Sequence, residues 1–125
     1  MRKFSLLAVV ALTATALLAL PAIGTAARDT SAPSVIKVSA LSSGLRFNTK
    51  VLRARAGSIK LVFTNLSTLR HNVRIESGEN ELGGTKTIAK GSTSTMLKLK
   101  KGTYNFYCSV PGHEDAGMKG KLIVS

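Results

Sequence analysis

The chain has 125 residues, with 18 Lys and Arg against 6 Asp and Glu, and its formal net charge is +12. This length allows one domain at most, and the single cysteine, Cys108, excludes an internal disulfide. The positive charge favours acidic partners or an anionic membrane surface. Nucleic acid is not expected as a partner, because the basic residues are spread along the chain without a basic helix or a finger motif.

Residues 1–27 have the order of features that is typical of a secretory signal peptide. Two basic residues precede a long uncharged stretch whose centre is almost entirely Ala, Leu, Val and Thr. Pro21 and Gly24 interrupt this stretch, and the small residues at 25–27 offer a cleavage point. We therefore expect export to the periplasm or another extracytoplasmic space. The alternative is that the segment stays uncleaved and anchors the protein in a membrane.

Cleavage after Ala27 would leave a mature chain with a net charge of +10, because the two basic residues of the signal peptide are lost. In this mature chain we expect a flexible polar leader over residues 28–34 and one domain over residues 35–125. A domain of this size can bury a modest core without disulfides. We expect it to be a monomer.

The domain has the pattern of an all-β protein, with short apolar stretches separated by Gly-containing turns. The clearest strand is SIKLVFTN at 58–65, where Ile59, Leu61 and Phe63 fall on one face. The polar, Gly-rich segment 76–84 is expected to form a long loop. This spacing of strands and turns indicates a β-sandwich or a β-barrel. Further strands are expected over 35–38, 45–47, 51–55, 71–75, 93–100, 103–108 and 121–124.

The last quarter of the chain gathers residue types that suit copper. Residues 108–118 read CSVPGHEDAGM, and His71 upstream is the only histidine outside this segment. One thiolate, two imidazoles and a weak thioether can make a trigonal site with a long axial bond. Zinc normally takes a harder fourth ligand or water in place of a thioether. A Cys-His nucleophile pair would need a substrate cleft and an orienting group, so a hydrolytic enzyme is not expected.

The segment GTYNFYCSVPGHEDAGMKG at 102–120 resembles the copper-binding loop of the plastocyanin/azurin cupredoxins. Upstream, AGSIKLVFTNLSTLRHNV at 56–73 resembles the strands that lead to their first histidine ligand. Four residues separate the cysteine from the second histidine, and four more separate that histidine from the methionine, as in auracyanin and rusticyanin. The resemblance implies a Greek-key β-sandwich that holds one type 1 copper ion. The ligands that it implies are His71, Cys108, His113 and Met118.

The resemblance also implies a function without enzymatic activity. A blue copper protein of this kind shuttles one electron between exported or membrane redox partners. Asn72 would help to hold the cysteine loop, and electrons would pass through the edge of His113, with Tyr107 as a second candidate route. The alternative is a copper-binding or copper-delivery protein without electron transfer, although such proteins usually use the exposed Met and His clusters that this chain lacks.

An acidic redox partner is expected from the charge of the mature chain. The lysines expected to steer this partner flank the strands that carry the copper loop. They are Lys98, Lys100, Lys101, Lys119 and Lys121.

Overall fold

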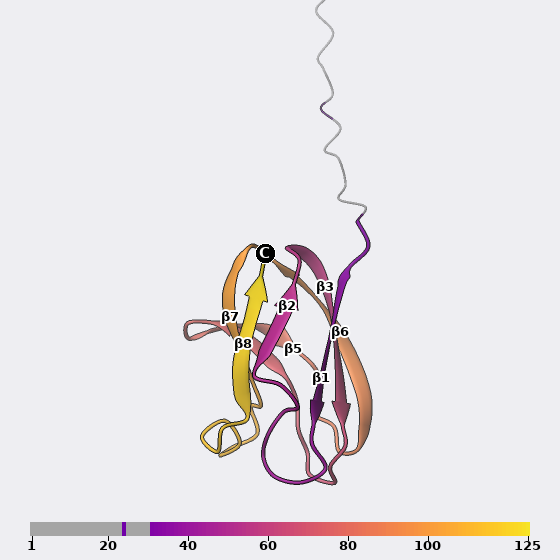
Figure 1. The fold of residues 1–125 in the computed structure, drawn as a ribbon, viewed down its shortest axis with the longest axis vertical. Helices are drawn as coiled ribbons and strands as arrows, with labels where there is room; N and C mark the ends of the chain where they lie inside the picture. The colour runs from indigo at the N-terminus through magenta and orange to yellow at the C-terminus, as the bar shows by residue number, and fades with distance from the viewer. Residues whose placement is uncertain (1–23, 25–30) are drawn as a thin grey trace, which may run out of the picture.

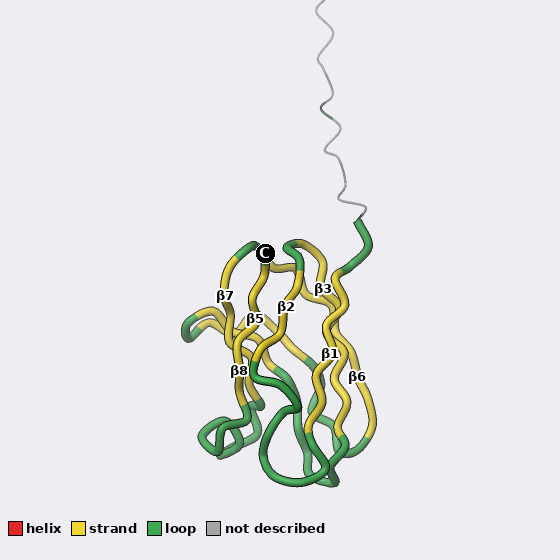
Figure 2. Tube along the Cα trace, in the orientation of Figure 1, coloured by secondary structure: helices red, strands yellow, loops and turns green. Residues whose placement is uncertain are grey.

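The fold consists of eight β-strands in two sheets (Figures 1 and 2). The computed structural model describes Gly24 and residues 31–125, so most of the predicted signal peptide and residues 28–30 of the predicted leader lie outside the described residues. In residues 31–125 there is no α-helix, and the described part of the chain therefore offers no helical membrane span. The strands are β1 (Ser34–Ala40), β2 (Val51–Ala54), β3 (Gly57–Asn65), β4 (Arg74–Ser77), β5 (Asn80–Gly84), β6 (Gly91–Leu99), β7 (Gly102–Tyr107) and β8 (Lys119–Val124).

The two sheets have the strand orders β1-β3-β6 and β2-β8-β7-β4-β5. Strand β1 pairs in parallel with β3, and β2 pairs in parallel with β8, while all other pairs of named strands are antiparallel. The chain passes from one sheet to the other between β1 and β2, β2 and β3, β3 and β4, β5 and β6, and β6 and β7. This arrangement confirms the predicted all-β Greek-key sandwich.

The core lies between the sheets and follows the alternation of the strands. In β3, Ile59, Leu61 and Phe63 have no exposed surface, as the sequence pattern predicts. Phe47, from the loop before β2, joins the two layers: its ring lies 6.3 Å from that of Phe63 and 5.5 Å from that of Phe106 on β7. Burial of these large apolar side chains supplies the main driving force for closing the sandwich.

Three local expectations are wrong. Residues 45–47 form no strand, and only Phe47 makes an isolated bridge, to Ala40. The strand expected over 71–75 begins at Arg74, and His71 instead makes an isolated bridge to Ile88. Neither segment forms a regular strand. The Phe47 side chain is buried in the core, and the His71 side chain is buried at one end of the sandwich.

The third correction concerns residues 76–84, which were expected to form a long loop and which contain a hairpin. Ser77 pairs with Asn80 across a two-residue turn in which Gly78 has a φ of 60°. Glycine in the first central position suits the tight turns that join antiparallel strands. Strand β5 was missed because it is a largely exposed edge strand, which needs no apolar alternation.

The register of β7 and β8 determines which segments lie at the two ends of the sandwich. Tyr107 pairs with Lys119 at one end of this strand pair, and Gly102 pairs with Val124 at the other. Residues 108–118 therefore project from one end, while the turn between β6 and β7 lies at the opposite end (Figure 1). Of the five lysines expected to steer a partner, Lys98, Lys100 and Lys101 lie at this opposite end. Lys121 lies within β8, where it pairs with Asn105, and Lys119 directly follows residues 108–118.

Candidate metal centre

His71 is held in a fixed backbone position at the end of the sandwich. Its N–H donates to the carbonyl of Ile88 at 3.0 Å, and its own carbonyl accepts from the N–H of Ile88 at 2.9 Å. The buried amide of Asn65 donates to the carbonyls of Leu69 (2.7 Å) and Ile88 (2.8 Å), which ties the loop before His71 to the same segment. The His71 side chain is completely buried.

Cys108 follows β7 directly and opens the loop that carries the remaining candidate ligands. Its N–H donates to the carbonyl of Met118 at 3.0 Å, and the N–H of Met118 donates to the carbonyl of His113 at 3.0 Å. A further bond from His113 N–H to the carbonyl of Val110, also 3.0 Å long, closes the turn between them. The backbone thus brings Cys108, His113 and Met118 together at the point where β7 ends and β8 begins.

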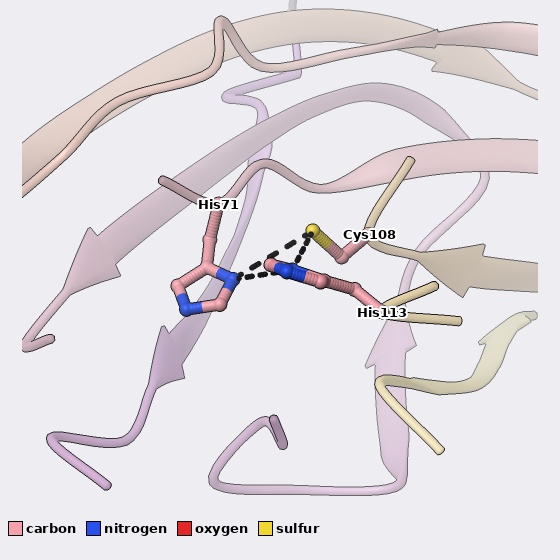
Figure 3. A group of neighbouring side chains, drawn as sticks. All are labelled: His71, Cys108 and His113. Carbon is pink, nitrogen blue, oxygen red and sulfur yellow. Dashed lines mark hydrogen bonds between the residues drawn. The ribbon is translucent and has the colours of Figure 1, made fainter. Parts of the chain in front are cut away.

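The donor atoms of His71, Cys108 and His113 converge on one point (Figure 3). The two Nδ1 atoms are 3.1 Å apart, and Cys108 Sγ lies 3.8 Å from Nδ1 of His71 and 3.6 Å from Nδ1 of His113. All three candidate ligand atoms lie within 4.8 Å of one another. Two imidazole nitrogens and one sulfur facing a common point form the His2Cys donor set that suits copper.

Met118 is completely buried, as is Cys108, and both belong to the apolar core. Its backbone N–H and carbonyl are bound by His113 and Cys108, so its position is set by two of the converging residues. A buried thioether beside a His2Cys set supplies the weak axial donor of type 1 copper sites. The donors present therefore fit a single copper ion, which the three converging residues would hold with Met118 as the fourth donor.

Asn72 connects the two segments that carry the converging residues. Its Oδ1 accepts from the N–H of Ser109 at 2.9 Å, and its Nδ2 donates to the hydroxyls of Ser109 (2.7 Å) and Thr87 (2.9 Å). The residue after His71 is thereby bonded to the residue after Cys108. Hydrogen bonds of this kind fix the orientation of metal ligands without contacting the metal themselves. The sequence pointed to Asn72 but gave no sign of Thr87 or Ser109, because these contacts bridge 15 and 37 positions.

The electrostatic setting of His71 favours the neutral imidazole. Burial lowers the pKa of His71 below its usual value, and the nearby His113 lowers this pKa further. A metal needs the imidazole nitrogen without a proton, so the site keeps His71 ready for binding. The other ring nitrogen, Nε2, is buried without a hydrogen-bond partner. His113 is only half-buried and is the member of the converging set that reaches the surface.

Tyr107 lies on the other side of β7 from Cys108 and faces the β4–β5 hairpin. Its hydroxyl donates to Oε2 of Glu81 at 3.1 Å, and Arg74 forms an ion pair with the same carboxylate. Burial and this hydrogen bond raise the pKa of Tyr107. Tyr107, the second candidate route for electrons, thus belongs to a polar network with Glu81 and Arg74 that the sequence did not predict.

A two-sheet sandwich that gathers two histidines, a cysteine and a methionine at one end defines a copper protein of the blue type. The chain belongs to the plastocyanin/azurin family of copper-binding proteins, whose sequence model matches residues 34–125. The fold, the copper cofactor and the family agree with what the sequence resemblance implied.

Curated relatives include two plastocyanins. The chain is 34% identical to plastocyanin from Rumex obtusifolius over 79 residues, which is 55% of this chain and 78% of that protein. It is also 34% identical to plastocyanin from Solanum crispum over 76 residues, 53% of this chain and 75% of that protein.

Among solved structures, the reduced auracyanin from Roseiflexus castenholzii superposes with a TM-score of 0.69 at 25% identity, covering 76% of this chain and 99% of that chain. Rusticyanin from Thiobacillus ferrooxidans has a TM-score of 0.63 at 22% identity, covering 75% of this chain and 79% of that chain. The rusticyanin similarity shows the fold alone.

Proposed function

We propose that this protein is an electron carrier in which one type 1 copper ion, bound by His71, Cys108, His113 and Met118, accepts and returns a single electron. The observation that carries the proposal is the convergence of three donor atoms from two separate segments within 4.8 Å. Bound copper supplies the Cu(II)/Cu(I) couple. The protein holds the donors in one arrangement for both oxidation states, which limits the rearrangement that accompanies each transfer.

The rigidity of the site supports electron transfer over copper delivery. His71 and Cys108 are fully buried, and Asn72 bonds their neighbouring residues together. A delivery protein must expose its ligands so that a recipient can replace them one at a time. We therefore propose electron transfer, and a slow release of Cu(I) to a strong external chelator is the expected behaviour. Release within seconds would favour the delivery function.

We propose that electrons enter and leave through the exposed edge of His113. It is half-buried, and its neighbours Val110, Pro111 and Gly112 present a small, mostly apolar surface. Leu66 and Leu69, on the loop that leads to His71, are 50% and 54% exposed and add apolar surface to this end. Small contact areas suit complexes that must dissociate quickly.

We further propose that the protein is exported and that its redox partner is acidic overall. The support is the sequence of residues 1–27 and the net charge of the mature chain, +10 without the two basic residues of that segment. Around the copper loop the charges are of both signs, since Glu114 forms an ion pair with Lys119 at 3.9 Å. Isolation of the protein from the extracytoplasmic fraction with its N-terminus at residue 28 would support cleavage and export.

Stopped-flow electron exchange with one acidic and one basic redox protein tests the proposal. The acidic partner should react faster, and its rate should fall steeply as salt rises, because opposite charges steer the encounter. A faster reaction with the basic partner would contradict the charge argument. The Val110→Asp substitution should slow exchange with both partners and leave the absorption spectrum unchanged. If the rates do not change, electrons leave elsewhere, and Tyr107 becomes the next candidate.

A further inference from the structure

Lys50 reaches from the loop before β2 to the backbone on both sides of Met118. Its ammonium donates to the carbonyl of Gly117 and, at 3.2 Å, to the carbonyl of Lys119. These partners lie 67 and 69 positions away along the chain. Hydrogen bonds from a charged donor are shorter and stronger than neutral ones. Lys50 therefore binds the residue before Met118 and the residue after it with a single charged group.

The backbone of Lys50 is itself fixed against β8. Its carbonyl accepts from the N–H of Lys121 at 2.8 Å, and Val51, the next residue, begins the parallel pairing of β2 with β8. Gly120 makes this approach possible, because a Cβ at that position would overlap the Lys50 carbonyl oxygen. The side chain thus starts from a fixed point a short distance from its two acceptors.

The backbone that Lys50 binds is a tight turn centred on Met118. The N–H of Lys119 donates to the carbonyl of Gly117 at 2.9 Å, which closes a three-residue turn. Gly117 has a φ of 100°, a conformation that other residues rarely adopt. The N–H and carbonyl of Met118 already form hydrogen bonds with His113 and Cys108, which belong to the same loop. The ammonium of Lys50 adds hydrogen bonds from a residue outside this loop.

We infer that Lys50 is a positioning residue for the axial ligand Met118, an inference that rests on the proposed copper site. A long axial bond to a thioether is weak, so copper alone holds this side chain poorly, and the protein must fix it. The ammonium of Lys50 does so by binding the carbonyl of the residue before Met118 and the carbonyl of the residue after it. Loss of this ammonium should loosen the turn and change the axial contact while leaving the His71, Cys108 and His113 donors in place.

The test compares the Lys50→Met protein with two matched proteins. Lys50→Arg keeps a positive charge and hydrogen-bond donors at the same position. Lys121→Met removes an exposed positive charge from β8, where Nζ of Lys121 donates to Oδ1 of Asn105 at 3.1 Å and not to the copper loop. Because Lys50 is solvent-exposed, its replacement is not expected to prevent folding, and Lys50→Gln provides a second uncharged variant.

Two measurements are made on each protein. Hydrogen exchange of the Lys119 amide, in the metal-free protein, reports opening of the turn, and it should accelerate by about tenfold or more in Lys50→Met, as expected for the loss of a charge-assisted bond. The electron paramagnetic resonance and absorption spectra of the Cu(II) protein report the axial contact, and both should change. Lys50→Arg should behave like the wild type, and Lys121→Met should leave exchange and spectra unchanged.

Unchanged exchange and unchanged spectra in Lys50→Met would overturn the inference. The same changes in Lys121→Met as in Lys50→Met would also overturn it, because they would come from charge alone. Failure of the proposed copper function has a different signature, the absence of a thiolate-to-copper band in the wild type. Hydrogen exchange in the metal-free protein still decides whether Lys50 holds the turn.

Discussion

Nδ1 of His71 and Nδ1 of His113 lie 3.1 Å apart, although the two residues are 42 positions apart in the chain. At this distance the two nitrogens have room for at most one hydrogen between them. Their backbone positions are fixed independently, by Ile88 for His71 and by Val110 for His113. The sandwich therefore holds two imidazole nitrogens close together, an arrangement that a bound metal ion would stabilise.

The lowered pKa of His71 predicts how the stability of the metal-free protein depends on pH. In the unfolded chain this histidine takes up a proton near pH 6.5, whereas burial and His113 keep it neutral in the folded protein to lower pH. Between these two pKa values the unfolded state binds more protons, so the free energy of unfolding falls as pH falls below about 6.5 and levels off below the folded pKa. Urea unfolding from pH 8 to pH 5 measures this slope, which His71→Gln should reduce. An unchanged slope in that variant would assign the effect to another group.

Met118→Gln should keep copper bound and make the site less oxidising. The axial thioether tunes the potential while three other donors hold the ion, so an amide oxygen in its place should stabilise Cu(II) relative to Cu(I). A redox titration combined with a Cu(II) affinity measurement separates the two properties. A large loss of Cu(II) affinity would show that Met118 is a primary ligand.

Asn72→Ala should destabilise the metal-free protein by about 1–3 kcal/mol, because it removes the three hydrogen bonds that this buried side chain makes to Ser109 and Thr87. It should also shift the potential, since the segment after Cys108 loses its tie to the segment after His71. Asn105→Ala is the matched control: Asn105 bonds to Glu76 and Lys121, outside the copper loop. Equal potentials in the two variants would remove Asn72 from the site.

Gly120→Ala should destabilise the protein by about 1–3 kcal/mol or more, because the added methyl group would overlap the Lys50 carbonyl and the Phe106 ring. Chemical unfolding of the metal-free protein measures the loss. Gly78→Ala serves as the comparison. A Cβ at position 78 would meet nothing within 4 Å. The substitution should therefore lower the free energy of unfolding only by the strain of a left-handed alanine at φ 60°, about 1–2 kcal/mol. Tolerance of Ala at position 120 would mean that β2 and β8 separate more easily than the packing indicates.

The sequence predicted what depends on local pattern. Alternation over 58–65 gave the buried face of β3, and the spacing of residues within 108–118 pointed to the copper loop. The sequence did not reveal β5, whose residues carry no apolar alternation because the strand lies at a sheet edge. It also missed Lys50, whose contacts with the copper loop exist only after β2 has paired with β8. Residue type alone does not distinguish Lys50 from the other lysines.

The absorption spectrum of the mature protein after addition of Cu(II), measured beside that of Cys108→Ser, tests the central claim most directly. Cys108 is the only cysteine, and its sulfur lies within 3.8 Å of both imidazole nitrogens. We predict an intense blue or green thiolate-to-copper band in the wild type and no such band in the serine variant, because a hydroxyl cannot supply the soft anionic donor. A colourless wild-type complex, or a serine variant that keeps the band, would contradict the central claim.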